Sequence, residues 1–402
     1  MTDPQKKFIP AILLASLLAR IAYALHTGNA LSYPDEGVYH NTAVAMLSAA
    51  DWGGFFHNRE PLYPVLVWLT YKVTGPLPLA VKLLQAAMST CGVYLIYRTA
   101  LRLFGRGAAV LALLLAALYP FSIFYDACLL RESLISFLGI AILYFALRIA
   151  PGRDRALLAA SALSGLAVTA KTIFLFYWLP LLLAALLLKR TTLRAALAAA
   201  AVFTLFISPL LFHNYHATGK FFLTRGQLLN LYIPLVLPKD VIGTPRENEA
   251  IARDPVCREG LALPEAERDV FFKAKVAEEL RLRPLNFAGR TGWRLLKLWR
   301  PYPHQGRDYA AGAWLFLVIV SLLSDGWLIP LGLWSAFSLR GRSAELYPAY
   351  IYLASFTVIY SLSWSQIRYR LPLMPVLIIL AAGPLARAAD RAGLTFLKED
   401  MK

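Results

Sequence analysis

Apolar segments make up most of the chain, and many are close to the length of a helix that crosses a bilayer. The runs 110–118, 156–170 and 195–205 contain no charged residue at all. A membrane-spanning helix needs about 20 predominantly apolar residues, and this criterion predicts ten such helices. They lie near residues 8–26, 78–103, 107–122, 130–148, 156–171, 173–188, 195–212, 312–338, 346–363 and 371–388. The pattern predicts an all-α fold, a polytopic transmembrane bundle of about ten spans.

Two segments between these helices are too long and too polar to be simple turns. Each contains short amphipathic stretches of the kind that lie along a membrane surface as helices, near residues 36–50, 61–71, 265–282 and 293–299. We therefore expect three parts. They are an N-terminal transmembrane module (1–212) with a functional first loop (27–77), an external loop region (213–311), and C-terminal transmembrane helices with a tail (312–402).

Composition agrees with a membrane protein. Of the 402 residues, 58% are hydrophobic and 16% are charged, and the mean hydropathy is +0.54. The net charge of +17 would suggest nucleic acid as a partner of a soluble protein, but Lys and Arg also accumulate in the cytoplasmic turns of membrane proteins. The predicted inside turns and tail hold Arg98, Arg102, Arg106, Arg148, Arg153, Arg155, Lys189, Arg190, Arg194, Arg340, Arg342, Arg387, Arg391 and Lys398. We expect no nucleic-acid partner.

The first apolar segment indicates the orientation. It follows Lys6 and Lys7 and lacks a small-residue cleavage site, so it reads as a retained signal anchor. An even number of spans then predicts that both termini are cytoplasmic and that the two long loops lie outside. We expect the protein to be integral to the inner, or plasma, membrane.

The motif Tyr33-Pro34-Asp35-Glu36 is the sharpest local feature of the first loop, with Tyr39 and His40 one helical turn further on. A carboxylate at this place can accept a proton from an incoming hydroxyl group, which is the task of a general base. The alternative is structural, because acidic residues after a proline commonly begin a helix.

A second acidic cluster lies at the predicted mouth of the fourth helix. Here Tyr125-Asp126 is followed by Arg131-Glu132. Ionisable residues at a membrane edge are costly unless they are paired or used in function. Either these residues contribute to a site, or Arg131 simply forms an ion pair with Asp126 or Glu132.

Several cations are also predicted to face outside. Guanidinium groups bind phosphate in a bidentate manner, so a group of them would suit a phosphorylated lipid. Individually, each side chain could instead extend to the membrane surface. The candidates are Arg59, Arg131, Lys171, Arg225, Arg368 and Arg370.

Other common sites are missing from the sequence. It has no glycine-rich phosphate loop, no His-Glu-x-x-His motif, no Gly-x-Ser-x-Gly motif and no dinucleotide fingerprint. A nucleotide donor is therefore not expected. His213 and His216 lack a carboxylate pattern that would complete a metal site, and we expect no required metal or other cofactor.

The order of these motifs resembles the GT-C class of membrane glycosyltransferases. The similarity is to the branch of the dolichyl-phosphate-mannose protein mannosyltransferases and the bacterial aminoarabinose transferases, along almost the entire chain. It rests on Tyr33-Pro34-Asp35-Glu36-x-x-Tyr39, Arg59-Glu60-Pro61-Leu62-Tyr63-Pro64, Leu130-Arg131-Glu132-Ser133-Leu134, Asn214-Tyr215-x-x-Thr218-Gly219-Lys220, Gln227-x-x-Asn230-Leu231-Tyr232 and Arg368-Tyr369-Arg370-Leu371-Pro372.

The resemblance implies a function and roles for these residues. A sugar would pass with inversion from a polyprenyl-phosphate-linked donor to an acceptor hydroxyl group of a lipid, glycan or protein outside the cytoplasm. Asp35 would be the general base, and Glu36 would orient it or bind the acceptor. Arg59 and Arg368 would lead the donor-phosphate ligands, followed by Lys171 and Arg225, with Arg131 and Arg370 as further candidates. Acceptor or sugar would be bound by Tyr33, Tyr39, His40, Asp126 and Glu132.

Departures from the family pattern concern the donor side. The segment Arg225-Gly226-Gln227 stands where many relatives have two small residues, and Lys171 stands where several have arginine. Two other classes of function also fit a bundle of this kind. A transporter would place ionisable groups near the bilayer midplane, whereas most charged residues here are predicted at the outer edge, although Arg20 and Lys82 lie deeper. A noncatalytic assembly subunit would keep the fold without the base.

Overall fold

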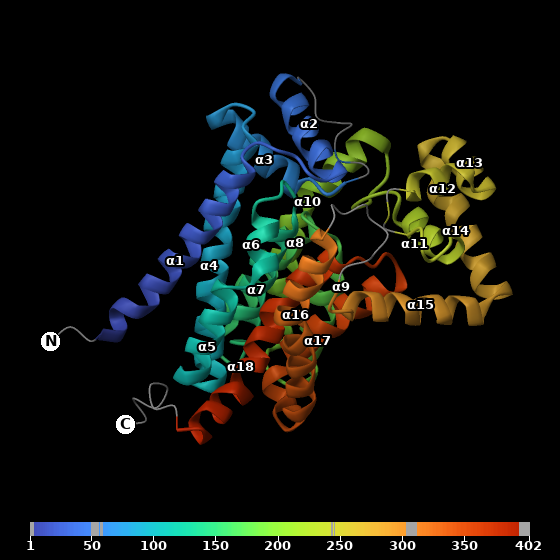
Figure 1. Ribbon diagram of the computed structural model, residues 1–402. Helices are drawn as coiled ribbons and strands as arrows, with labels where there is room; N and C mark the ends of the chain where they lie inside the picture. Colours follow the sequence, from blue (N-terminus) through green and yellow to red (C-terminus); the bar gives the residue numbers. More distant parts are fainter. Residues whose placement is uncertain are drawn as a thin grey trace.

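The computed structural model describes residues 4–49, 56, 59–242, 244, 246–302 and 312–393, and its regular elements are all helices (Figure 1). The α-helices are α1 (Pro4–Thr27), α2 (Pro34–Ser48), α3 (Leu62–Thr74), α4 (Pro78–Phe104), α5 (Arg106–Ala117), α6 (Pro120–Asp126), α7 (Glu132–Ala146), α8 (Asp154–Val168), α9 (Ile173–Leu187), α10 (Leu193–Thr218), α11 (Gln227–Val236), α12 (Glu247–Arg253), α13 (Pro255–Ala262), α14 (Glu265–Leu282), α15 (Pro284–Trp299), α16 (Ala313–Ser338), α17 (Ser343–Leu362) and α18 (Met374–Arg391). Two 3-10 helices are η1 (Arg340–Arg342) and η2 (Ile367–Leu373).

The expected all-α membrane fold is confirmed, but the number of long spans is smaller than ten. Each predicted segment contains a helix, yet within the described residues only five helices are long and apolar enough to cross a bilayer. A sixth is counted if α5 and α6, which meet at a bend of 47°, form one span. Helices α7, α8 and α9 have only 15 residues each, fewer than the roughly 20 apolar residues that cross a bilayer.

The basic turns gather at one end of the bundle. Arg342 follows α16 and donates to the carbonyl of Leu103 at the end of α4 over 3.2 Å. Arg190 follows α9 and donates to the carbonyl of Ala344 over 2.8 Å. Helices α2 and α3 lie at the opposite end of the bundle (Figure 1). The two ends therefore differ in charge, as the sequence predicts.

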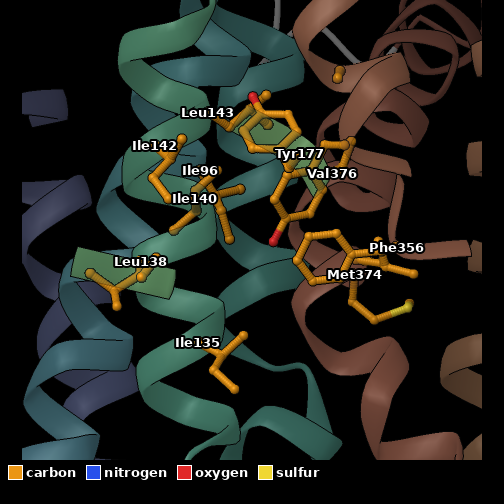
Figure 2. Packing of buried hydrophobic residues seen from close by; sticks show 14 of the residues in the cluster. Ile96, Ile135, Leu138, Ile140, Ile142, Leu143, Tyr177, Phe356, Met374 and Val376 are labelled. Atoms are coloured by element: carbon orange, nitrogen blue, oxygen red, sulfur yellow. The ribbon is translucent and has the colours of Figure 1, made fainter. Parts of the chain in front are cut away.

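The core of the bundle is apolar and closely packed. Figure 2 shows Ile140 and Leu143 of α7 beside side chains of the neighbouring helices, among them Tyr177 of α9, Phe356 of α17 and Val376 of α18, and all are buried. Small residues allow some helices to approach closely. A Cβ atom on Gly165 of α8 would lie 2.7 Å from the carbonyl oxygen of Phe203 in α10.

The amphipathic stretches predicted from the sequence are helical in the structure. Helices α2 and α3 contain the first two stretches, α14 coincides with the third, and α15 contains the fourth. Helices α11 to α14 lie to one side of the bundle, and α15 runs across toward α16 and α17 (Figure 1). The loop region has a small core of its own, in which Tyr232, Ile233, Cys257, Phe272 and Val276 are buried.

Candidate active site

Asp35 lies in the first turn of α2 and faces two arginines from distant parts of the chain. Arg368 of η2 donates from Nη2 to Oδ2 of Asp35 over 2.6 Å. Nη1 of Arg59 lies 4.0 Å from the other carboxylate oxygen. The Asp35 side chain remains 36% exposed, whereas that of Arg368 is 14% exposed. The structure thus brings together the expected base and the two leading phosphate ligands.

Arg368 also contacts a second carboxylate. Its Nε atom lies 3.5 Å from Oε1 of Glu132, the first residue of α7. The other oxygen of Glu132 is buried and has no hydrogen-bond partner among the described residues. One guanidinium group therefore lies between two acidic side chains, one exposed and one buried.

The charges around Asp35 affect its ionisation. Partial burial alone would raise the pKa of this carboxyl group, but the guanidinium groups of Arg368, Arg59 and Arg131 outweigh burial and hold the pKa below its usual range. Asp35 is therefore ionised at neutral pH. An ionised carboxylate that is open to solvent can accept a proton from a hydroxyl group.

An ion pair between Arg131 and Glu60 lies near Asp35. Arg131 bonds Oε2 of Glu60 over 2.5 Å, so its partner is neither Asp126 nor Glu132. The other oxygen of Glu60 accepts hydrogen bonds from the backbone and the hydroxyl group of Thr172, over 3.2 and 3.0 Å. Despite its burial, Glu60 has a lowered pKa because of Arg131 and these bonds.

Lys171 lies next to this pair but is enclosed by aromatic rings. Its Nζ atom is 3.8 Å from the centre of the Tyr369 ring and 5.2 Å from that of Tyr360. Burial and the nearby charge of Arg131 lower the pKa of Lys171 to about 7.

Three residues expected to bind substrate have structural contacts instead. Glu36 is buried, and its carboxylate accepts hydrogen bonds from the backbone amides of Ser32, Tyr33 and Leu129 over 3.0, 2.9 and 2.7 Å. It connects the start of α2 to the segment before α7. Because both of its oxygens are occupied by backbone groups, an acceptor cannot use them without breaking this connection.

Asp126 and Arg370 are likewise withdrawn from the surface. Asp126 accepts from Arg20 over 2.9 Å and from Ser89 and Ser133 over 2.5 and 2.6 Å. Arg370 is bonded to Asp325 and is 2% exposed. Both side chains are therefore engaged with buried partners, and the roles predicted for them stay predictions.

The remaining candidates, Tyr39, His40 and Arg225, each contact other side chains of the protein. Tyr39 is buried and packs edge-on against Tyr63, and the guanidinium group of Arg59 lies 5.7 Å from its ring centre. His40 contacts the hydroxyl group of Tyr71 over 2.8 Å. Arg225 lies 3.7 Å from Glu265 in the loop region 213–311.

A cavity of about 540 Å³ opens beside Arg368. Three cations line it, Lys297 and Arg300 at the end of α15 and Arg368 of η2, and no carboxylate does among the lining residues of the described chain. The other lining residues are mainly apolar or aromatic: Tyr23, Tyr33, Pro120, Phe121, Ile123, Phe124, Tyr125, Phe316, Leu317, Val320, Ser321, Gln366 and Ile367. The cavity combines a cationic edge with apolar walls.

Lys297 and Arg300 were not among the residues selected from the sequence. The available signal was the unusual amphipathic pattern of α15, which places Arg290, Arg294 and Lys297 on one face. That face points into the protein, where Lys297 donates to the carbonyl of Ile242 over 2.8 Å. Burial lowers the pKa of Lys297 to about 8. In the described residues, no group of three His, Cys, Asp or Glu side chains is placed to hold a metal ion.

A family model and several solved structures match this chain. The model of a family described as dolichyl-phosphate-mannose-protein mannosyltransferase matches residues 58–213, the part of the chain that contains Arg59, Glu60, Arg131, Glu132 and Lys171. No curated protein matches the chain in sequence.

Solved structures match the chain over nearly its whole length. ArnT from Cupriavidus metallidurans is similar with a TM-score of 0.60 at 16% identity, covering 98% of this chain and 62% of ArnT. The same protein bound to undecaprenyl phosphate gives 0.59 at 17% identity, over 97% and 63%. The archaeal oligosaccharyltransferase AglB from Archaeoglobus fulgidus, in complex with an inhibitory peptide and a dolichol-phosphate, gives 0.56 at 14% identity, over 98% and 52%.

These similarities establish the fold. The chain has the fold of ArnT and AglB, and the GT-C resemblance expected from the sequence is confirmed. The chain spans about three fifths of the length of ArnT and about half that of AglB.

Proposed function

We propose that this protein is an inverting glycosyltransferase that moves a sugar from a polyprenyl-phosphate-linked donor to an acceptor hydroxyl group at the extracytoplasmic face of the membrane. The observation that carries the proposal is the contact between Asp35 and Arg368 at the edge of the cavity. It places a carboxylate base beside a cation that can hold a phosphate.

The cavity suits the donor lipid. Its aromatic and apolar walls are suited to a prenyl chain, because apolar surface gains free energy when it leaves water. Arg368, Lys297 and Arg300 supply positive charge on the same cavity. Guanidinium groups form paired hydrogen bonds with phosphate oxygens, so the phosphate is expected at this cationic edge.

The chemistry requires one base and one stabilised leaving group. Asp35 accepts the proton of the acceptor hydroxyl group while the hydroxyl oxygen bonds to the anomeric carbon of the sugar. The bond between that carbon and the phosphate oxygen breaks, and its electron pair remains on the phosphate. Arg368 lies where this negative charge develops. A single displacement of this kind inverts the configuration at the anomeric carbon.

The position of the charges supports an extracytoplasmic site. Basic turns gather at the end of the bundle away from α2, and such turns favour the cytoplasm. The Asp35 cluster would then face the opposite side. Solved structures of similar fold were obtained with lipid phosphates, undecaprenyl phosphate in ArnT and a dolichol-phosphate in AglB, which supports the donor class.

The deep charges do not favour a transporter. Arg20 is paired with Asp126, and Lys82 donates to the carbonyls of Gly28 and Ala30 over 2.9 Å each. Ionisable residues with a complete set of partners of this kind need no substrate to explain them.

Sugar transfer by purified protein in liposomes tests the proposal. The donors are polyprenyl phosphates that carry hexoses or pentoses, and the acceptors are lipid, glycan and peptide hydroxyl compounds. We expect transfer by the wild type and a loss of about 100-fold or more in Asp35→Asn, since a general base contributes roughly 10² to 10⁴ in rate. Asp154→Asn, at the far end of α8, is the matched control.

Two outcomes would contradict the proposal. Full transfer by Asp35→Asn would remove Asp35 as the base. Uptake of a substrate into the liposomes without any transfer would instead support a transporter.

A further inference from the structure

Arg370 follows Arg368 by two residues on η2 but points into the protein. It is 2% exposed and bonds the carboxylate of Asp325 in α16. Its Nη1 atom also donates to the carbonyls of Leu298 and Arg300, at the end of α15, over 3.0 and 2.6 Å. A single guanidinium group therefore connects three elements.

Asp325 extends the connection to a fourth element. The hydroxyl group of Tyr119 donates to Oδ1 of Asp325 over 2.7 Å, and Tyr119 directly precedes α6. Asp325 is completely buried and Tyr119 is 6% exposed. In sequence, Arg370 and Asp325 are 45 residues apart, and Tyr119 and Asp325 are 206 apart. Local sequence pattern could not indicate this cluster.

The four connected elements also line the cavity. Helix α6 contributes residues that begin at Pro120, next to Tyr119. Helix α16 contributes Ser321, one turn before Asp325, and η2 contributes Arg368. The end of α15 contributes Lys297 and Arg300, and the latter's carbonyl is a partner of Arg370. Arg370, Asp325 and Tyr119 therefore connect four elements that line the cavity.

We infer that Arg370, together with Asp325 and Tyr119, is a positioning residue that fixes the cations Arg368, Lys297 and Arg300 around the phosphate of the donor. This inference rests on the proposed function. Arg370 itself does not touch the donor. It acts because the same guanidinium group holds η2, which carries Arg368, and the carbonyls of the segment that carries Lys297 and Arg300.

The need for arginine at this position follows from its geometry. The guanidinium group has several N–H donors in a rigid plane and can serve a carboxylate and two carbonyls at once. A lysine keeps the charge beside Asp325 but is a flexible point charge. With Arg370→Lys, the end of α15 is no longer fixed to η2 in the same way, while the charge balance of the cluster is preserved.

Steady-state kinetics of Arg370→Lys distinguish positioning from general destabilisation. We expect the KM for the donor to rise about tenfold and the kcat to fall, because Arg368 also stabilises the leaving phosphate, while the KM for the acceptor stays close to wild type. Tyr119→Phe removes one hydrogen bond and is expected to raise the donor KM by a smaller factor. It also provides the test if Arg370→Lys does not fold. Binding of undecaprenyl phosphate in detergent should weaken in parallel.

Ser335→Ala is the matched control. Ser335 bonds the carbonyl of Leu380 over 2.6 Å and so joins α16 to α18 away from the cavity. This variant should lower the unfolding temperature without changing the donor KM.

The outcomes separate the inference from the proposed function. If Arg370→Lys and Tyr119→Phe reduce only the fraction of active protein, with an unchanged donor KM and unchanged binding of undecaprenyl phosphate, the inference is overturned. If the wild type transfers no sugar from any polyprenyl-phosphate donor, the proposed function fails instead.

Discussion

Arg368 and Asp35 are 333 residues apart in the chain, and the guanidinium group of one donates to the carboxylate of the other over 2.6 Å. The contact joins the first long loop to the entry of the last helix. Arg368 lowers the pKa of Asp35, the expected base. Under the proposed function, the same arginine also contacts the leaving phosphate.

Replacing Arg368 with methionine should move the acidic limb of the pH–rate profile to higher pH. Arg368 lowers the pKa of Asp35, whereas burial raises it, so burial dominates more once the arginine is gone. Because the ionised form is the base, activity is lost as the pH falls through this pKa. The profile of kcat at saturating donor measures the shift. Arg342→Met, which disrupts an exposed pair with Glu345 at the other end of the bundle, should leave the limb in place.

Filling the cavity should weaken donor binding. Val320 of α16 lines the cavity, and Val320→Trp would occupy space needed by the prenyl chain. We expect the donor KM to rise by about tenfold or more, which corresponds to about 1.4 kcal/mol or more of binding free energy. Leu323→Trp is the control on the same helix, since Leu323 is 73% exposed and does not line the cavity. An equal effect of both variants would argue against this site for the lipid.

Glu36→Gln should reduce stability more than the rate of the folded protein. A glutamine has only one acceptor oxygen, whereas the Glu36 carboxylate accepts from three backbone amides. Hydrogen bonds to charged groups contribute roughly 1.5–3 kcal/mol, so we expect a loss of about 2 kcal/mol in the free energy of unfolding. Thermal unfolding in detergent measures this loss. A rate per folded molecule as low as that of Asp35→Asn would instead show that Glu36 takes part in catalysis.

Lys171 should make stability depend on pH. Its pKa is about 7 in the folded protein, and an unfolded lysine has a pKa near 10.4. Between these values the unfolded chain binds more protons, so stability rises with pH, and the destabilising charge is fully present below about pH 7. Lys171→Met should lack this rise, whereas Lys72→Met, at an exposed lysine over Trp68, should keep it. Unfolding temperatures from pH 7 to pH 10 give the comparison, and parallel curves for wild type and Lys171→Met would exclude the effect.

Gly165→Ala should destabilise the bundle. The added Cβ atom would lie 2.7 Å from the carbonyl oxygen of Phe203 and 2.8 Å from Cβ of Phe206, so α8 and α10 would have to separate. Overpacking of this kind costs about 1–3 kcal/mol. Gly289→Ala in α15 meets no atom within 4 Å and should be neutral or slightly stabilising. A similar unfolding temperature for both variants would contradict the close packing of α8 against α10.

The number of long spans shows where sequence pattern fails. Hydropathy averages over a window and cannot detect a turn that is itself apolar. Leu118 and Tyr119 are such residues, and the chain bends by 47° between α5 and α6 around them. The break between α8 and α9, in contrast, contains Lys171 and was predicted from the sequence. The helices were predicted in the right order, but their lengths depend on breaks that packing and hydrogen bonding determine.

The structure separates candidate site residues that the sequence grouped together. Asp35 lies at the start of a helix in the first long loop, and a local pattern is enough to place it there. Arg368 and Arg370 differ by only two positions and share the same chemistry, so the sequence could not separate them. In the structure one contacts Asp35 and lines the cavity, while the other is buried against Asp325.

The sequence by itself determined the all-α membrane fold, the basic end of the bundle and the place of Asp35 in the first loop. These features depend on apolar run length, turn composition and local helix signals, which neighbouring residues encode. Only the tertiary structure decided which charges meet. The partners Arg20 and Asp126 are 106 residues apart, and Arg131 and Glu60 are 71 apart. Removing charges from water is costly unless they pair, but which pair forms depends on helix packing in three dimensions.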